Sequence, residues 1–523
     1  MTPHRPVTRG KAARVTAIRL VAGVLAVTAF TAACGLKPDA TQSLKASGTA
    51  GAGGGGGGGG GGVNGAGGPN INGGPGVLPG GTGGSVPGVG GSGGTNGTGG
   101  GTNGTGGGTN GTGGGTNGTG GGNVACGTPH GGDTTGITSS HINIGVHAPL
   151  TGTGTPFPNN SFAAGADTFW KRPGHTVCGR MVHAEIQDDQ YTPAHARQVC
   201  SAMAKRDFLV VGGGGTDQIQ ACATEPYIHS NNVPYLSAGV TDNGLNNLSN
   251  YFAISLTYQQ QGTLVLKNAQ AQGIADPAAS TIDSDNIPGQ KAKWAVVTAS
   301  SPNFLGARKG MEAALSAAHI PYKEYNRDQN SSTANGDAGQ FGQTLALNGF
   351  KTVFVDMAPG YFVFMTAGYY KQPGAVANWV GPGVTYTEIT VAQYICQQSQ
   401  NEISGHAWFL APAPGVDRAT SDFKQAYGST YDDIEWALWG LSNDLWNLLK
   451  FASANLTRQT FLDSTMHAVV PSNPYVPVDF RDHGGHFGGT GAWVQKVNCS
   501  ESEPGQSSAG AWDTVGSSYL RLF

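Results

Sequence analysis

A glycine-rich segment of about ninety residues limits what the first part of this chain can fold into. The unit TNGTGGG is repeated in tandem from Thr95 to Gly122. Glycine loses more conformational entropy on folding than any other residue, and this stretch has almost no apolar side chains to bury in return. It is therefore expected to be a disordered spacer, with an r.m.s. span of roughly 50 Å. Repeat slippage without a mechanical role is the alternative.

The residues before the spacer resemble a bacterial export signal. Residues 1–19 contain basic but no acidic side chains, Leu20–Phe30 is an apolar run, and small residues lead to Cys34. This order predicts a secretory signal, and the apolar run is too short to span a bilayer comfortably. The stretch TAACG resembles a lipobox, although Thr31 stands where leucine is usual. Residues 1–33 are therefore expected to be a lipoprotein signal and Cys34 the lipidated residue, with an ordinary signal peptide and an incidental cysteine as the alternative.

The charge of the mature chain argues against two classes of partner. The chain has a formal net charge of −3, and removal of the five basic residues of the signal would leave about −8. Nucleic acids and anionic membrane surfaces bind basic surfaces, so neither is an expected partner. Residues 34–131 form the expected tether, and the nearly four hundred residues that follow are enough for two domains.

The chain contains seven cysteines. Assigning Cys34 to lipid leaves six, an even number in an exported chain, which predicts up to three disulfides. Cys200 and Cys222 lie on an expected helix and just past the next strand, a separation that neighbouring β–α units can close. The absence of a CxxC pair from the sequence argues against a zinc or thioredoxin-type site. The other pairings follow only by elimination, and their connectivity stays open: Cys126–Cys178 and Cys396–Cys499.

Expected strands and helices alternate from about Gly132 onward. The segments HINIGVHAPLTG, RMVHAEIQDD, FLVVGGGG and VPYLSAG are typical of buried strands that end in turns. Helices are expected between them, including a single helix over residues 216–231. The pattern restarts with the strands KWAVVTAS, TVFVDMAP and ANWVGPGV. This alternation predicts an α/β fold of two doubly wound parallel-sheet lobes, with ligand-facing turns at the strand ends.

From Gly136 to Val497 the chain resembles the type I periplasmic-type solute-binding proteins of the leucine/isoleucine/valine-binding family. The likeness rests on INIGVHAPLTG, DDQYTPAHARQVC, VVGG and VPYLSAGVTD in lobe one, and on NWVGPGVTY in lobe two. Members of this family are the extracellular ligand-binding subunits of ABC importers. A lipid anchor with a tether also suits such subunits in bacteria without an outer membrane.

The resemblance implies how the lobes are joined and what the protein does. It implies a monomer, lipid-anchored at the extracellular face of the cell membrane, that closes on a small molecule and delivers it to ABC permease subunits without a cofactor. A sensor of the same fold that serves a signalling partner, and a surface protein with a degenerate cleft, are alternatives. The implied three-strand hinge has crossings near Ser255–Tyr258, Leu410–Pro412 and Val478–Asp482. The implied lobes are residues 132–256 with 411–478, and 257–410 with 479–523.

The glycine turn Gly212–Gln218 is the main candidate site of lobe one. It feeds a helix, so its backbone amides can hold an anionic group, although a tight β–α turn explains it equally well. A nucleotide site does not fit, because no Lys-Ser/Thr follows the glycines and no GxGxxG has a βαβ context. By the resemblance, the ligand contacts of lobe one are Leu150, Thr151, Phe157, Gly215, Thr216, Gly239, Val240 and Thr241.

Lobe two departs from the family pattern. Amino-acid binders of the family carry an acid after the "GP" turn that binds the ligand ammonium, but here Gly383 follows Pro382. A buried ammonium without a carboxylate would cost several kcal/mol. We therefore expect a small polar or aromatic metabolite without a free amine, unless another acid, such as Asp356 or Glu388, reaches the cleft. The lobe-two and hinge candidates are Tyr258, Phe304, Pro359, Tyr361, Gly383 and Tyr386.

The sequence offers little sign of catalysis or of a resident metal. Outside the glycine-rich spacer, neither GxSxG nor HExxH is present, so we expect a protein that is not an enzyme. His483 and His486 lie near Asp479 and Asp482, which invites a metal interpretation. Their spacing matches no firm motif, and a polar turn between strands explains it as well, so no metal or other cofactor is expected.

Overall fold

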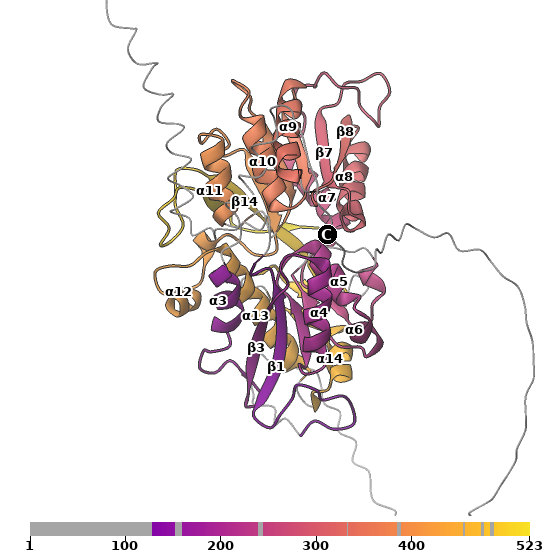
Figure 1. Ribbon diagram of the computed structural model, residues 1–523, viewed down its shortest axis with the longest axis vertical. Coiled ribbons are helices and arrows are strands. Elements are labelled where there is room, and N and C mark those ends of the chain that lie inside the picture. The colour runs from indigo at the N-terminus through magenta and orange to yellow at the C-terminus, as the bar shows by residue number, and fades with distance from the viewer. Residues whose placement is uncertain are drawn as a thin grey trace, which may run out of the picture. The chain divides into compact units, whose positions relative to one another are not determined.

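The computed structural model describes residues 128–151, 159–238, 244–331, 333–383, 387, 389–452, 455–471, 475–481 and 486–522. These residues belong to one compact unit. Within it, two sheets with separate hydrophobic cores define two groups of elements, which we call lobe one and lobe two (Figure 1). The expected signal, Cys34 and nearly all of the expected tether lie outside the described residues.

Lobe one is built on a six-stranded sheet of order β2-β3-β1-β4-β5-β6. Its strands pair in parallel except at the short edge strand β2, as expected from the β–α alternation. Strand β1 is buried over most of its length because helices cover both faces of the sheet. The strands are β1 (His141–Ala148), β2 (Thr176–Val177), β3 (Arg180–Asp188), β4 (Leu209–Gly212), β5 (Tyr235–Ser237) and β6 (Tyr251–Ala253).

The helices of lobe one come from two parts of the chain. The expected single helix over residues 216–231 is two helices, because Pro226 lacks the backbone N–H that a helix interior needs and begins a new one. The first part gives α3 (Asn159–Thr168), α4 (Pro193–Ala204), α5 (Thr216–Ala223), α6 (Pro226–Ser230) and η1 (Leu245–Asn247). The second gives η3 (Val416–Arg418), α12 (Ser421–Tyr427), α13 (Asp433–Phe451), α14 (Arg458–Thr465) and the hairpin β12 (Val469–Val470) with β13 (Val478–Asp479).

Lobe two is built on a larger, mixed sheet of order β15-β14-β11-β10-β9-β7-β8, with β16 beside β14. The strands from β7 to β11 pair in parallel, whereas the chain after residue 490 adds an antiparallel edge. The strands are β7 (Trp294–Ala299), β8 (Tyr322–Arg327), β9 (Thr352–Asp356), β10 (Asn378–Pro382), β11 (Ala407–Ala411), β14 (Gly491–Asn498), β15 (Ala511–Thr514) and β16 (Leu520–Arg521).

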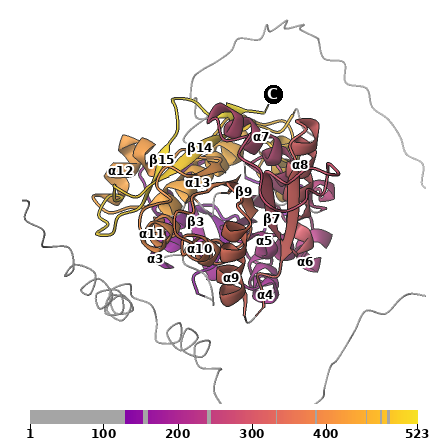
Figure 2. The ribbon, with the colours of Figure 1, turned by 90° about the horizontal axis from the view of Figure 1, so that it is seen from above.

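Helices cover both faces of the lobe-two sheet. Figure 2 shows the pair α7 (Tyr258–Ala271) and α8 (Leu305–Ala317) on one side, and the pair α9 (Ala334–Leu347) and α10 (Pro359–Tyr369) on the other. The remaining elements are η2 (Pro302–Phe304) and α11 (Ile389–Gln398). The strand β9 is wholly buried in the middle of this arrangement, so its carboxyl end lies at the centre of the sheet edge.

The chain passes between the lobes three times. The first two passages follow β6 and β11, close to the expected positions. The third lies near residues 488–491, later than the expected 478–482, because Phe480 and Phe487 both pack in the cores of lobe one. The backbone of Gly488 and Gly489 then donates hydrogen bonds to Ala253 and Ser255, which ties this passage to the first one.

Each lobe contains one disulfide whose two cysteines both belong to the described residues. Cys200 of α4 is bonded to Cys222 of α5, the pair that the sequence favours, and Cys396 of α11 is bonded to Cys499 after β14. Cys178 is also disulfide-bonded, and its expected partner Cys126 lies outside the described residues. The disulfides Cys200–Cys222 and Cys396–Cys499 therefore tie helices to their own lobe rather than one lobe to the other.

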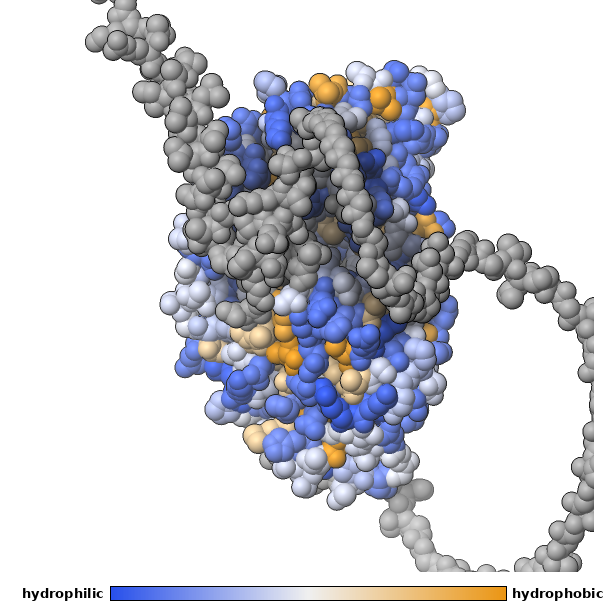
Figure 3. All heavy atoms as spheres, viewed as in Figure 1, coloured by the Kyte–Doolittle hydropathy of each residue, from blue (hydrophilic) through white to orange (hydrophobic). Residues whose placement is uncertain are grey.

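The described surface carries few large apolar side chains. Figure 3 shows that hydrophilic residues dominate the coloured part of one face, with hydrophobic residues in small groups. The exposed large hydrophobic residues are spread over four elements: Met181, Leu347, Phe451 and Val469. Among the described helices, none has both the length and the apolar character needed to cross a membrane.

Candidate ligand-binding site

A cavity of about 110 Å³ lies between the carboxyl ends of the strands of the two lobes. This is where an open α/β sheet places a ligand site, because the turns that follow parallel strands meet at one edge. Lobe one contributes Tyr191, Pro193, Gly212–Ile219 and Ala238. Lobe two contributes Tyr258, Phe304, Gln329, Asn330, Asp356–Pro359, Pro382 and Gly383.

The lobe-one wall is the turn between β4 and α5. Gly215 is the N-cap of α5 and has a φ of 81°, a conformation that a side chain would strain. The Gly213 N–H donates to the His147 carbonyl at 2.9 Å, which fixes the turn against β1. The first N–H groups of α5 have no acceptor within the helix, so they can meet a ligand oxygen. Asp217 lies in that same first turn and lines the cavity.

The lobe-two wall is formed by the ends of β9 and β10. Gly381 is required on β10, because an added Cβ would lie 2.2 Å from the Val355 carbonyl oxygen. This close approach brings the turn at Gly383 next to the end of β9, where Asp356 lines the cavity. Tyr258 and Phe304 add an aromatic pair, with ring centroids 6.0 Å apart and planes inclined by 24°.

Among the described residues, three side-chain hydrogen bonds run between the two walls, and we call this set the latch. The Thr216 and Tyr258 hydroxyls lie 2.7 Å apart. Asp217 Oδ1 accepts hydrogen bonds from Ser301 Oγ at 2.8 Å and from Asn303 Nδ2 at 2.5 Å. Every one of these bonds runs from α5 of lobe one to the start of α7 or to the η2 segment of lobe two, so the latch holds the lobes together beside the cavity.

Asp356 differs from Asp217 in its surroundings. It is 2% exposed, and its Oδ2 atom has no hydrogen-bond partner among the described residues. Burial raises the pKa of Asp356 well above its usual range, because the charged form loses its hydration. Burial also raises the pKa of the Tyr191 hydroxyl, with smaller contributions from the Asp217 and Asp189 carboxylates.

The structure brings together six of the residues proposed from the sequence. Gly215, Thr216, Tyr258, Phe304, Pro359 and Gly383 all line the cavity. Leu150 and Thr151 are not among its lining residues; Thr151 instead donates through its backbone N–H and its hydroxyl to Asp188. Tyr361 is buried and accepts a hydrogen bond from Arg327 Nε at 3.1 Å. Phe157, Gly239, Val240, Thr241, Tyr386 and Glu388 lie outside the described residues.

Several of the lining residues that were not proposed as contacts are polar. Tyr191, Asp217, Gln218, Gln329 and Asn330 all follow strand ends or begin helices. Asp217 and Gln218 belong to the glycine turn that the sequence analysis proposed as a site, so that turn could have led to both residues. Asp356 was named only as an acid that could replace the missing one after the GP turn. Its place directly after four buried strand residues could have marked it as a cavity residue.

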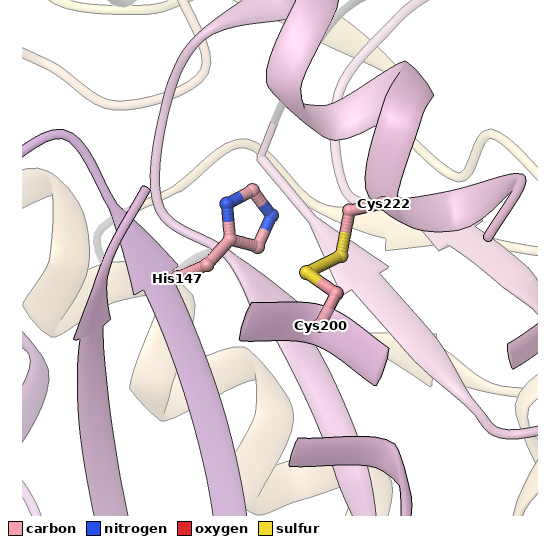
Figure 4. Close-up of side chains that lie close together, drawn as sticks. All are labelled: His147, Cys200 and Cys222. Carbon is pink, nitrogen blue, oxygen red and sulfur yellow. A yellow bond between two sulfur atoms is a disulfide. The ribbon is translucent and has the colours of Figure 1, made fainter. Parts of the chain in front are cut away.

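A buried cluster behind the lobe-one wall resembles a metal site but is already bonded. His147 lies beside the Cys200–Cys222 disulfide (Figure 4). Both sulfur atoms are oxidised, so neither offers the thiolate that a metal needs. The His147 ring is also engaged at both nitrogens, with Asp189 Oδ2 at 2.8 Å and the Tyr235 hydroxyl at 2.6 Å. This cluster therefore serves as packing that supports the glycine turn.

His486, from the other candidate metal segment, is bonded to the backbone. Its Nδ1 lies 2.8 Å from the Tyr251 carbonyl oxygen, next to the passage between the lobes. His483 and Asp482 lie outside the described residues. Asp479 pairs with Arg481 at the surface, at 2.7 Å.

Comparison with a protein-family model classifies the chain. The model described as "Periplasmic binding protein" matches residues 141–505, which include both lobes and the cavity. The chain belongs to the periplasmic binding protein family. This membership confirms the resemblance drawn from the sequence motifs. Members of the family are binding proteins of transporters, so this family member is a binding protein and not an enzyme.

Solved structures share the fold of this periplasmic binding protein at low sequence identity. The fatty acid ABC transporter substrate-binding protein from Thermomonospora curvata has 14% identity and a TM-score of 0.59, over 74% of this chain and 95% of that chain. A solute-binding protein of an ABC transporter from Rhodopseudomonas palustris HaA2, in complex with p-hydroxybenzoic acid, has 14% identity and a TM-score of 0.57, over 73% and 98%. No curated protein matches the chain.

A leucine-binding protein from Thermotoga maritima is a further structural neighbour. It has 12% identity and a TM-score of 0.54, over 71% of this chain and 97% of that chain. At these identities the likeness establishes the fold alone. The two-lobed α/β fold expected from the sequence is therefore confirmed, and the choice of ligand has to be argued from the cavity itself.

Proposed function

We propose that the protein is a lipid-anchored, extracellular solute-binding subunit of an ABC importer that closes its two lobes on a small polar or aromatic metabolite. The observation that carries this proposal is the cavity at the facing strand ends, lined from both lobes and bordered by the latch. A ligand that contacts both walls stabilises the closed arrangement by its greater affinity for that arrangement.

Three further observations support the same function. Structural neighbours are solute-binding proteins of ABC transporters, and several are complexes with hydroxybenzoates or benzoate. The aromatic pair Tyr258–Phe304 offers a flat apolar surface for a ring. Several polar side chains line this cavity. Polar groups that converge on a cavity are typical of a binding site and would not be expected in a surface protein with a degenerate cleft.

Isothermal titration of the full chain against a broad panel of small metabolites tests the binding role. We expect at least one compound to bind with a Kd below about 10 µM, since importer subunits must capture dilute solutes. The matched control is a Gly215→Val variant, in which a side chain strains the positive-φ turn and fills space beside the cavity. Absence of binding by every compound, with a folded wild-type protein, would contradict the function.

Fractionation of cells that express the Cys34→Ala variant tests the proposed anchor. Lipidation requires the Cys34 thiol, so we expect the variant to be released into the medium while the wild type stays with the membrane. A variant that stays in the membrane fraction as firmly as the wild type would contradict the anchor. The proposed permease partner is tested in the same cells, where uptake of a ligand identified by titration should require this gene.

A further inference from the structure

The described residues that line the cavity include acids but no base. Asp217 and Asp356 each contribute a carboxyl group, and no Lys, Arg or His is among the described lining residues. The segments that continue the chain from two lining residues, 239–243 and 384–386, contain no basic residue either. A cavity of this composition favours a cationic or neutral ligand over an anionic one, because buried charges of like sign repel.

The helix N-terminus in the lobe-one wall does not reverse this preference. An unoccupied helix N-terminus favours an anion, since its free N–H groups carry a partial positive charge. In α5, Asp217 lies in the first turn and supplies a full negative charge at that position. The partial charge of the helix is therefore opposed by the carboxylate of the protein itself.

Asp356 has what a receptor for a ligand group requires. It lines the cavity, it is 2% exposed, and its Oδ2 atom has no partner among the described residues. A buried polar atom without a partner destabilises a fold, and at the wall of a cavity a ligand group can supply the missing hydrogen bond. Asp217 cannot play this role as readily, because its Oδ1 already accepts from Ser301 and Asn303.

The aromatic pair adds a second feature that suits a cation. Tyr258 and Phe304 line the cavity and stack on each other. The face of an aromatic ring attracts a cation, and it also packs against the apolar part of an organic ligand. A carboxyl group and an aromatic face in one small cavity together fit an amine attached to an apolar group.

We propose that Asp356 binds a protonated amine and that the ligand of this cavity is therefore a small organic cation. The inference rests on the proposed binding function and specifies its ligand. It also replaces the expectation of a ligand without an amine, which depended on Gly383 standing in place of an acid. The cavity contains an acid after all, supplied by the end of β9 instead of the turn after β10.

Binding is expected to release a proton from Asp356. Without ligand, burial favours the protonated carboxyl group, because it raises the pKa of Asp356. When the ammonium arrives, the carboxyl group loses its proton to the buffer and the carboxylate pairs with the ammonium, so the ligand itself stays protonated. The other titratable groups that line the cavity are Tyr191, Asp217 and Tyr258, and none of them is basic.

Three probes of similar size separate the possible charges: benzylamine, benzyl alcohol and benzoate. We expect titration calorimetry at pH 7 to show that the wild type binds benzylamine at least tenfold more tightly than benzyl alcohol, and benzoate least. The isosteric Asp356→Asn variant should bind benzylamine about 10- to 100-fold more weakly, as expected for the loss of one charge-assisted hydrogen bond. Its affinity for benzyl alcohol should change by less than threefold.

Asp444→Asn is the matched control. Asp444 is also buried, both of its carboxyl oxygens lack a partner among the described residues, and it lies on α13 outside the cavity lining. We expect it to leave benzylamine affinity within twofold, and thermal melts should show that both variants are folded. Comparison of the two variants shows whether benzylamine binding depends on Asp356 itself or on the removal of any buried acid.

Two results would overturn the inference. One is tighter binding of benzoate than of benzylamine by the wild type, and the other is an Asp356→Asn variant that keeps its benzylamine affinity. If the wild type ignores all three probes but binds another metabolite equally well with or without Asp356, the cation assignment is wrong while the binding function stands. If it binds nothing in the broad metabolite panel, the binding function itself is contradicted.

Discussion

Asp217 and Asp356 line the same cavity from opposite lobes, yet their carboxyl groups have different surroundings. Asp217 is partly exposed and accepts two hydrogen bonds from lobe two. Asp356 is almost fully buried, and its Oδ2 atom has no partner among the described residues. The difference indicates that one acid stabilises the closed arrangement of the protein, whereas the other is kept for the ligand. The predictions below test this division of roles.

Removing the disulfides should have the largest effect, and it should differ between the lobes. The double variant Cys200→Ala/Cys222→Ala should lose roughly 3 kcal/mol of unfolding free energy, and Cys396→Ala/Cys499→Ala about 1 kcal/mol more. The second pair closes the longer loop, with a sequence separation of 103 against 22. Urea denaturation measures both values.

The two disulfide variants should also differ in ligand binding. Cys222 lies on α5, the helix that carries Asp217, so its loss should loosen the lobe-one wall and weaken benzylamine binding. The lobe-two variant serves as the control and should bind nearly as well as the wild type. Equal loss of affinity in both variants would show that the disulfides act only through overall stability.

Asp217→Ala should open the lobes and weaken ligand binding about 10- to 100-fold. It removes two hydrogen bonds between the lobes, and ligand affinity falls in proportion to the loss of the closed population. Small-angle X-ray scattering should report a larger radius of gyration for the unliganded variant. Asp217→Asn keeps an acceptor oxygen and should show a smaller change, which makes it the control. An unchanged radius together with unchanged affinity would contradict the latch.

Tyr258→Phe should have the smallest effect, a loss of about fivefold in ligand affinity. The variant removes the hydroxyl that bonds Thr216 but keeps the ring beside Phe304, so it isolates one neutral hydrogen bond worth about 1 kcal/mol. Titration of the variant with benzylamine gives the value. A loss as large as that of Asp217→Ala would mean that charge adds nothing to the latch.

Much of the fold could be predicted from the sequence because its signals are local. The alternation of apolar strands with helices indicated both parallel sheets, and the glycine turn before α5 marked the lobe-one wall. The antiparallel edge formed by β14 and β15 was missed, since antiparallel pairing at a sheet edge depends on where the chain returns in space. The third passage between the lobes was displaced for the same reason: the packing of Phe487 in lobe one leaves no sequence pattern.

The candidate site was only partly predictable. Gly383 was found through a family motif, whereas Asp356 was named only as a substitute acid because an acid at the end of a strand has no spacing signature. Its importance depends on two facts of three-dimensional structure, its place on the cavity wall and its lack of a partner for Oδ2 among the described residues. The latch likewise joins residues 42 to 86 positions apart, which no local pattern relates.

The division of roles between the two acids is tested most directly by counting the protons released when benzylamine binds. Calorimetry in phosphate and in Tris at pH 7 gives this number, because the two buffers differ in ionisation enthalpy. We predict that the wild type and Asp217→Asn release more protons on binding than Asp356→Asn, and that wild-type benzylamine binding tightens as the pH rises toward the raised pKa of Asp356. Equal proton release by the wild type and Asp356→Asn would contradict the assignment of Asp356 as the receptor for the ligand.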